Sequence, residues 1–207
     1  MYKLYYNEGT AAFAPQMVLE EIGAEYRLEL VDISTDKPRD PEFLKLNPNG
    51  WVPVLIDGDL VMHESAAIVM YLCDRHPEAG LAPPPGDALR GRFYQWLVYM
   101  ADTLQIAYQM NYYPERHSTN PDHIPAVVDK AHERLGRVWG YIDDSLDPGP
   151  YMLGESFSAC DLFVYMLTTW HPKGEAFLAS VPNVARCAER VTQRLAVQRT
   201  MKVHGLA

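Results

Sequence analysis

The chain has 207 residues, of which 48% are hydrophobic and 22% charged, and its formal net charge is −9 at pH 7. This length suits one large domain or two small ones, and the composition excludes a disordered or collagen-like chain. The acidic excess disfavours nucleic acid and anionic membrane surfaces as partners, because both carry dense negative charge.

The first part of the chain alternates patterns typical of strands and helices. A β-α-β unit is followed by a weak helix, two antiparallel strands and a closing helix, which gives the order β-α-β-α-β-β-α. Asp57-Gly58 between two apolar runs predicts a hairpin. The predicted elements are 1–7, 14–22, 26–31, 43–46, 51–56, 59–62 and 65–72.

A stiff segment rich in proline, Ala82 to Asp87, divides the chain. Beyond it, apolar residues recur at three- and four-residue steps over 93–108 and 124–142, which predicts two long amphipathic helices. Residues 161–168 are apolar on nearly all sides and predict a central helix, opened by a Ser158-x-x-Asp161 capping box. With a last helix over 183–195, we expect domains at 1–80 and 88–207 joined by a linker at 81–87.

The cysteines of the chain are three in number and show no C-x-x-C or Cys/His spacing. We therefore expect neither disulfides nor a bound metal, and a cytoplasmic protein with reduced thiols. No basic head with an apolar run opens the chain, and no stretch reaches the roughly 18 apolar residues of a membrane span. An association with membranes is therefore not expected.

Pro53 interrupts the strand that follows Asn47-Pro48-Asn49-Gly50. Proline cannot donate to a strand ladder, so this strand lies at an edge or is irregular. A cis Val52-Pro53 bond would leave the Val52 main chain available to an extended, peptide-like ligand. The residues alone favour an ordinary trans proline, because cis bonds are rare.

Glu64 and Ser65 stand where the second hairpin strand passes into a helix. Free amides and the positive helix end make such a junction suitable for a carboxylate, with the Ser65 hydroxyl as a further donor. Glu64 is suited to an ammonium group, so the pair predicts a site for an α-amino acid end. A purely structural role, in which Ser65 caps the helix and Glu64 favours its dipole, is equally compatible with the residues.

Taken together, NPNGWVPVL, DG, HESAAIVMYL and a helical half with its capping box resemble a cytosolic glutathione transferase, nearest to the bacterial beta-like classes. The resemblance covers both halves and implies a thioredoxin-like domain with cis-Pro53, an all-helical domain, a homodimer and a role in detoxification. It implies glutathione as co-substrate, with Val52 pairing with the cysteinyl part and Glu64 and Ser65 holding the γ-glutamyl end. Further contacts implied by the resemblance are Lys37 and Trp51 with the glycyl end, and Asp102 reaching across the dimer.

The chain departs from this family at the group that activates the glutathione thiol. The bacterial Cys-Ser pair falls on Ala11-Ala12, and neither alanine side chain donates a hydrogen bond. Three donors remain, namely the Thr10 hydroxyl, the Tyr6 phenol and the amides near Ala11 and Ala12. We favour Thr10 with the amides assisting; the structural alternatives are a helix cap for Thr10 and core packing for Tyr6.

An aromatic set on the helical half suits a flat, hydrophobic electrophile. The resemblance implies conjugation of the glutathione thiolate to such a substrate; the alternatives are a non-catalytic protein that binds glutathione or an aromatic ligand, and a glutathione-dependent isomerase or ether-cleaving enzyme. The same residue types are also common in plain helical cores. The expected substrate-binding residues are Tyr108, Asn111, Tyr112, Tyr113, His117, Trp170 and His171.

Overall fold

A computed structural model of the chain describes residues 1–34, 36–146 and 148–206. It contains two compact units, one formed by residues 1–84 with 191–207 and the other by 85–190. The division at residue 84 falls within the predicted linker. The C-terminal end differs from the predicted 88–207 domain, because α10 (Leu195–Val203) packs on α1 (Phe13–Glu21) of the first unit.

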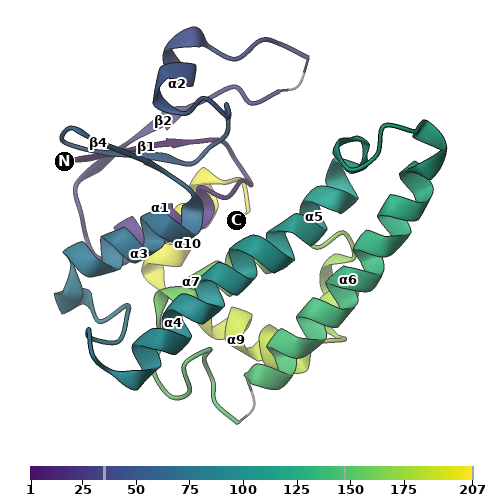
Figure 1. Ribbon diagram of the computed structural model, residues 1–207. Coiled ribbons are helices and arrows are strands. Elements are labelled where there is room, and N and C mark those ends of the chain that lie inside the picture. The colour runs from purple at the N-terminus through teal and green to yellow at the C-terminus, as the bar shows by residue number, and fades with distance from the viewer. Residues whose placement is uncertain (35, 147, 207) are drawn as a thin grey trace. The chain divides into compact units, whose positions relative to one another are not determined.

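The first unit is built on a four-stranded sheet with the strand order β2-β1-β3-β4. Figure 1 labels β1, β2 and β4 of this sheet. β1 and β2 run parallel, whereas β3 is antiparallel to both of its neighbours. This confirms the predicted β-α-β-α-β-β-α order of a thioredoxin-like domain. Its elements are β1 (Tyr2–Tyr6), α1, β2 (Tyr26–Leu30), α2 (Pro41–Leu46), β3 (Val54–Asp57), β4 (Leu60–His63) and α3 (Ser65–Arg75), with a 3-10 turn at Pro77–Ala79.

The register of the sheet brings three separate segments to one of its ends. Val54, the first residue of β3, lies opposite Tyr5 of β1 and His63 of β4. The loop that follows β1, the Val52-Pro53 segment and the β4–α3 junction therefore share this end of the sheet. These are the segments in which the sequence predicted binding and catalytic residues.

The hairpin forms with a turn one residue later than predicted. Asp57 pairs with Leu60, so the turn residues are Gly58 and Asp59, and Gly58 has a φ of 58° that glycine adopts without steric cost. Asp57 is held in the strand because its carboxylate accepts a hydrogen bond of 2.7 Å from the Tyr71 hydroxyl. This side-chain contact, absent from the local pattern, sets the register.

The second unit is helical throughout its regular elements. A π-helical turn, Met100–Leu104, interrupts the first of the two predicted long helices between α4 (Ala88–Tyr99) and α5 (Gln105–Tyr112). The predicted last helix ends earlier, at Thr192, and α10 follows it. The remaining elements are the 3-10 turns Pro114–Arg116 and Pro121–His123, α6 (Ile124–Ser145), α7 (Ala159–Thr168), α8 (Gly174–Leu178) and α9 (Pro182–Thr192).

All residues of α7 are buried, as its apolar sequence predicted. The predicted capping box is present: Asp161 accepts a 2.7 Å hydrogen bond from the Ser158 amide, and the Ser158 hydroxyl accepts one from Cys160. Asp161 also accepts a 2.7 Å hydrogen bond from the amide of Met152, which ties the preceding loop to the helix start. Burial raises the pKa of Asp161 to about 6, whereas the hydrogen bonds from Met152 and Ser158 stabilise the ionised carboxylate.

No helix within the described ranges is both long and apolar enough to span a membrane.

Candidate functional site

The Val52-Pro53 peptide bond is cis, so the trans interpretation favoured by the residues alone is wrong and the implication of the resemblance is confirmed. Val52 is buried against Val31, Phe43 and Val54, and the ladder of β3 begins only after it. Within the described chain, the main-chain N–H and C=O of Val52 have no hydrogen-bond partner. They are available to the main chain of an extended ligand.

The loop before Val52 is held by its own side chains. Asn47 donates a 2.7 Å hydrogen bond to the carbonyl oxygen of Trp51 and accepts one from the amide of Asn49. Asn47 is itself buried, although it is polar, and these bonds satisfy its amide group. Hydrogen bonds within the chain therefore already hold the loop that leads to Val52.

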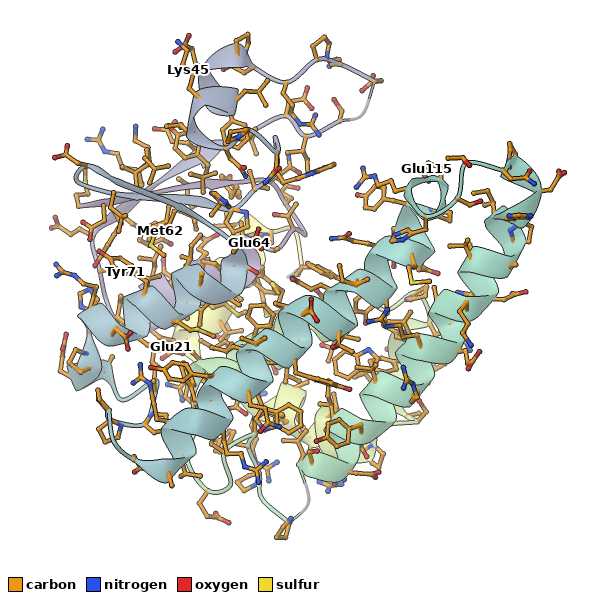
Figure 2. All side chains as sticks on the ribbon, viewed as in Figure 1. Glu21, Lys45, Met62, Glu64, Tyr71 and Glu115 are labelled. Atoms are coloured by element: carbon orange, nitrogen blue, oxygen red, sulfur yellow. The ribbon has the colours of Figure 1, made fainter. Side chains whose placement is uncertain are left out.

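Glu64 has φ 71° and ψ 107°, and it is the sole non-glycine residue with positive φ among those described. It is the N-cap residue of α3 and lies at the start of that helix (Figure 2). It makes no side-chain cap bond, and its exposed carboxylate has no hydrogen-bond or ion-pair partner in the described chain. A strained conformation that presents an unpaired carboxylate is typical of a binding site.

Ser65 lies buried at the first position of α3. The structural hypothesis that Ser65 caps this helix is wrong, because Glu64 occupies the cap position and Ser65 is already helical. The first amides of a helix have no intrahelical acceptor, so α3 presents donors beside the Glu64 carboxylate. The junction therefore combines a negative group with several donors.

The hydroxyl of Thr10 is already engaged inside its own loop. It donates a 2.7 Å hydrogen bond to the carbonyl of Asn7 and accepts a long one of 3.4 Å from the amide of Ala12. Thr10 is not the N-cap residue of α1; Ala12 is, and it has no side-chain cap bond. The amide of the half-buried Ala11, just before the start of α1, has no acceptor within the described chain.

Tyr6 ends β1 with a half-buried side chain. Its ring lies 5.7 Å from the His204 ring, centroid to centroid, and its hydroxyl makes no hydrogen bond with any described residue. Tyr6 thus combines the packing role that the sequence suggested with an unpartnered phenol.

His204 reaches the same loop from the far end of the chain, which the sequence did not predict. Its Nδ1 accepts a 3.1 Å hydrogen bond from the amide of Gly9, and its Nε2 lies 2.9 Å from Oε1 of Gln16. Burial lowers the pKa of His204 to about 4, so the ring is neutral at neutral pH. No local motif marks this residue, because its partners lie almost the whole chain away.

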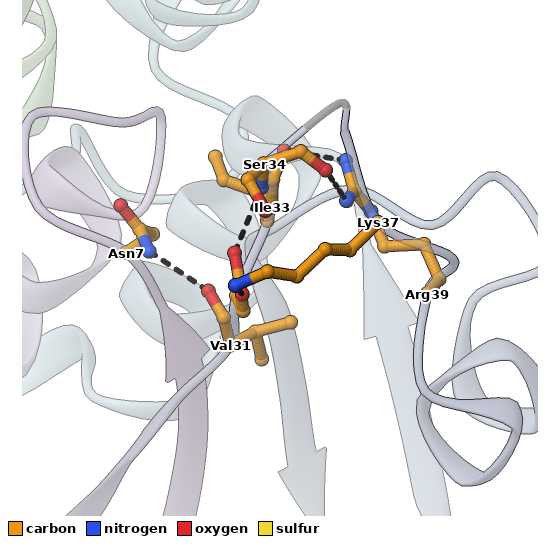
Figure 3. A network of polar contacts seen from close by, with 7 residues as sticks. Asn7, Val31, Ile33, Ser34, Lys37 and Arg39 are labelled. Atoms are coloured by element: carbon orange, nitrogen blue, oxygen red, sulfur yellow. Dashed lines mark hydrogen bonds and ion pairs between the residues drawn. The ribbon is translucent and has the colours of Figure 1, made fainter.

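Lys37 and Trp51, expected at the glycyl end of a ligand, are held by other contacts. Lys37 is exposed and its ammonium lies 3.4 Å from Asp32 (Figure 3). The Arg39 guanidinium lies 5.2 Å from the Trp51 ring and donates hydrogen bonds to the carbonyls of Ile33, Ser34 and Gly50. Arg39 thereby connects Ile33 and Ser34 with Gly50 and Trp51.

Tyr108 is a core residue of the helical unit, which corrects its predicted contact with a substrate. It is 2% exposed, donates a 2.9 Å hydrogen bond to the carbonyl of Leu167 and accepts one of 3.0 Å from Nε1 of Trp139. Tyr112 stacks on it and donates a 2.5 Å hydrogen bond to the carbonyl of Trp170. Nε1 of Trp170 is buried without a partner among the described residues, so Tyr112 and Trp170 form one aromatic group with an unused donor.

The other predicted residues of the helical unit have separate surroundings. Asn111 contacts His132 at 2.8 Å, and the Tyr113 ring lies 3.9 Å from the Arg116 guanidinium. His171 stacks on Phe177, and burial lowers its pKa to about 4, which disfavours it as an acid or base near neutral pH. His117 and Asp102 are exposed, and Asp102 lies in the π-helical turn.

The described residues contain no group of three or more His, Cys, Asp or Glu side chains suited to holding a metal ion. The three cysteines are buried, Cys73 in α3, Cys160 in α7 and Cys187 in α9.

Residues 1–74 match the family described as "Glutathione S-transferase, N-terminal domain". Glutathione S-transferase 3 of Zea mays is 30% identical over 192 residues, which cover 89% of this chain and 85% of that protein. A glutathione transferase structure from Methylococcus capsulatus has a TM-score of 0.85 and 33% identity, with 100% of both chains covered. A sphingomonad glutathione S-transferase, solved in complex with glutathione, has a TM-score of 0.84 and 29% identity over 99% of this chain and 100% of its own. The chain therefore belongs to the glutathione S-transferase family.

Proposed function

We propose that the protein is a glutathione S-transferase that conjugates the glutathione thiolate to a hydrophobic electrophile. The observation that carries the proposal is the joint presence, at one end of the sheet, of the unpaired Val52 main chain and the unpaired Glu64 carboxylate on a strained backbone. The strained backbone of Glu64 costs free energy, and a bound ligand that pairs with its carboxylate gives that strain a function. Family membership and the relative solved with glutathione support the same ligand.

Glutathione would bind in an extended conformation at this end of the sheet. Its cysteinyl N–H and C=O pair with the main chain of Val52. Its γ-glutamyl ammonium pairs with Glu64, and its γ-glutamyl carboxylate accepts hydrogen bonds from the Ser65 hydroxyl and the first amides of α3. The proposed contacts of the glycyl end are Lys37 and Trp51. Lys37 would have to leave Asp32 in order to make this contact.

The thiolate would be stabilised chiefly by the amide of Ala11 at the positive end of α1, with Thr10 in second place. The Ala11 amide has no competing acceptor, whereas the Thr10 hydroxyl must leave the carbonyl of Asn7 before it can donate to sulfur. A helix N-terminus lowers the pKa of a thiol because the thiolate is the form it stabilises. Tyr6 is the alternative donor.

The electrophile would bind to aromatic residues of the helical unit, among which Tyr112, Tyr113 and Trp170 are favoured and His117 is a candidate polar contact. We also propose a cytoplasmic homodimer in which Asp102 of a second subunit approaches bound glutathione, and a role in detoxification. The exposed position of Asp102 on the π-helical turn supports such a contact.

The test is the ultraviolet absorbance of the thiolate of bound glutathione, titrated with pH and followed by turnover assays on aryl halides, epoxides, isothiocyanates and enones. A thiol pKa well below the free value of about 8.5, together with turnover, supports the proposal. Tight binding with an ordinary thiol pKa and no turnover would instead indicate a glutathione carrier, which the engaged hydroxyl of Thr10 would then explain. Absence of binding would overturn both.

A further inference from the structure

We infer that His204, near the C-terminus, is a positioning residue that holds the thiol-activating loop between β1 and α1. The inference rests on the proposed function, because it concerns where the Ala11 amide is placed. His204 acts through Gly9, two residues before Ala11, and is not itself proposed to touch glutathione.

The two hydrogen bonds of His204 define which ring nitrogen carries the proton. The Gly9 amide donates to Nδ1, so Nδ1 holds the lone pair and Nε2 carries the hydrogen, which it donates to Oε1 of Gln16. The bond from Gly9 and the bond to Gln16 require the same tautomer, so the ring can make both at once. The side chain connects the loop before α1 to a residue in the first turns of that helix.

The surroundings of His204 leave its ring little freedom. The residue is 3% exposed, and its ring lies 4.8 Å from that of Phe13 and 5.7 Å from that of Tyr6. Gln16 is fully buried and continues the network by donating a 3.3 Å hydrogen bond to the Tyr26 hydroxyl. A buried, fully paired polar network fixes geometry more tightly than apolar packing alone.

The helix that carries His204 is fastened to α1 by two ion pairs. Arg194 makes a bidentate contact with Glu21 at 2.6 and 2.7 Å, and Arg199 lies 2.6 Å from Glu20. These contacts place α10 along α1, and His204 at its end meets the loop. The C-terminal segment thus contacts α1 near both of its ends, and His204 also contacts the loop.

Within the loop itself, the carbonyl of Thr10, which belongs to the same peptide unit as the Ala11 amide, accepts a 3.1 Å hydrogen bond from the amide of Phe13, and side chains hold the residues before it. Asn7 donates to the carbonyl of Val31, and Thr10 bonds back to Asn7. Gly9 has a φ of 65°, where glycine is freer than any other residue, so an external partner for its amide has a large effect on the loop. His204 is that partner.

Two substitutions separate the bond to Gly9 from the bond to Gln16. Asparagine places its carbonyl oxygen near the position of Nδ1, so His204→Asn keeps an acceptor for the Gly9 amide and loses the bond to Gln16. Glutamine reaches the position of Nε2, so His204→Gln keeps a donor to Gln16 and leaves the Gly9 amide unpaired. The two variants form a matched pair of polar, neutral replacements.

We expect the pKa of the bound glutathione thiol to rise by about half a unit or more in His204→Gln and to stay near its original value in His204→Asn. The affinity for S-methylglutathione, which lacks the thiol, should be the same in both variants, because the Val52 and Glu64 contacts are untouched. Equal thiol pKa values in the two variants and the unsubstituted protein would overturn the inference alone. An ordinary thiol pKa in the unsubstituted protein would overturn the proposed activation, and this inference with it.

A second measurement keeps the inference testable if a variant fails to fold. The ¹⁵N chemical shifts of the His204 ring in the unsubstituted protein should report the Nε2–H tautomer at neutral pH. The Nδ1–H tautomer would exclude the bond from Gly9 and refute the inference.

Discussion

Glycine in place of Glu64 is expected to make the protein more stable and a poorer binder of glutathione. At φ 71° and ψ 107° a non-glycine backbone is strained by about 1–2 kcal/mol, and glycine removes this strain. Glycine also adds about 0.4–1 kcal/mol of conformational entropy to the unfolded chain, which opposes the gain. The free energy of unfolding should therefore rise by about 0.5–1 kcal/mol, and Tm by a few degrees for a chain of this size.

Binding should change in the opposite direction. The carboxylate of Glu64 has no partner within the described chain, so its loss leaves no buried group unpaired and affects only the ligand. A hydrogen bond to a charged group contributes about 1.5–3 kcal/mol, which corresponds to a roughly ten- to 150-fold weaker Kd for glutathione.

Isothermal titration with glutathione and urea unfolding measure the two quantities on the same samples. Glu64→Gln is the control for charge, since it keeps the strained backbone and should lose affinity without gaining stability. A glycine variant that is less stable than the unsubstituted protein would refute the claim of strain at this position. Unchanged affinity in both variants would show that the γ-glutamyl end binds elsewhere.

Asp161→Ala should lower the free energy of unfolding by about 3 kcal/mol in urea, because the buried amide of Met152 and the Ser158 cap lose their acceptor; a loss below 1 kcal/mol would contradict this. Thr10→Val should raise the thiol pKa of bound glutathione by less than about half a unit if the main chain is the principal donor; a rise of two units would identify the hydroxyl instead. Because the pKa of His204 is lowered to about 4, the unfolded chain binds more protons between pH 4 and 6.5. Its contribution to stability is thus complete above pH 6.5 and declines toward pH 4, and denaturation across this range should show a shallower decline in His204→Gln.

Much of the first unit follows from local pattern. Strand and helix periods, the hairpin signal and the proline-rich connector are short-range features, and the structure places each of them close to its predicted position. The turn lies one residue later than predicted because Asp57 bonds to Tyr71 in a different element, and the residues beside Pro53 do not by themselves distinguish a cis from a trans bond. Local rules fail where a distant contact outweighs them.

The helical unit shows why aromatic spacing did not separate core from site. Tyr108 and Tyr112 are one helical turn apart, and both carry a hydroxyl. The hydroxyl of Tyr108 is satisfied by Leu167 and Trp139, whereas Tyr112 is 49% exposed. The difference lies in partners on other helices, so a periodic pattern predicts a shared face but not which member of the face is covered.

The Ala11-Ala12 pair made thiol activation the weakest prediction from the sequence, because no side chain there can donate. A main-chain amide needs no particular side chain at its own position; it needs a helix start and a loop held in one direction. The residues on which such a donor depends are then those that hold the loop, and in this chain they include Asn7, which follows β1, and His204, which follows α10. A search for the activating residue among side chains at positions 10–12 would miss both, since neither is proposed to contact the sulfur. Substitutions at Thr10 should accordingly be tolerated better than substitutions that release Gly9.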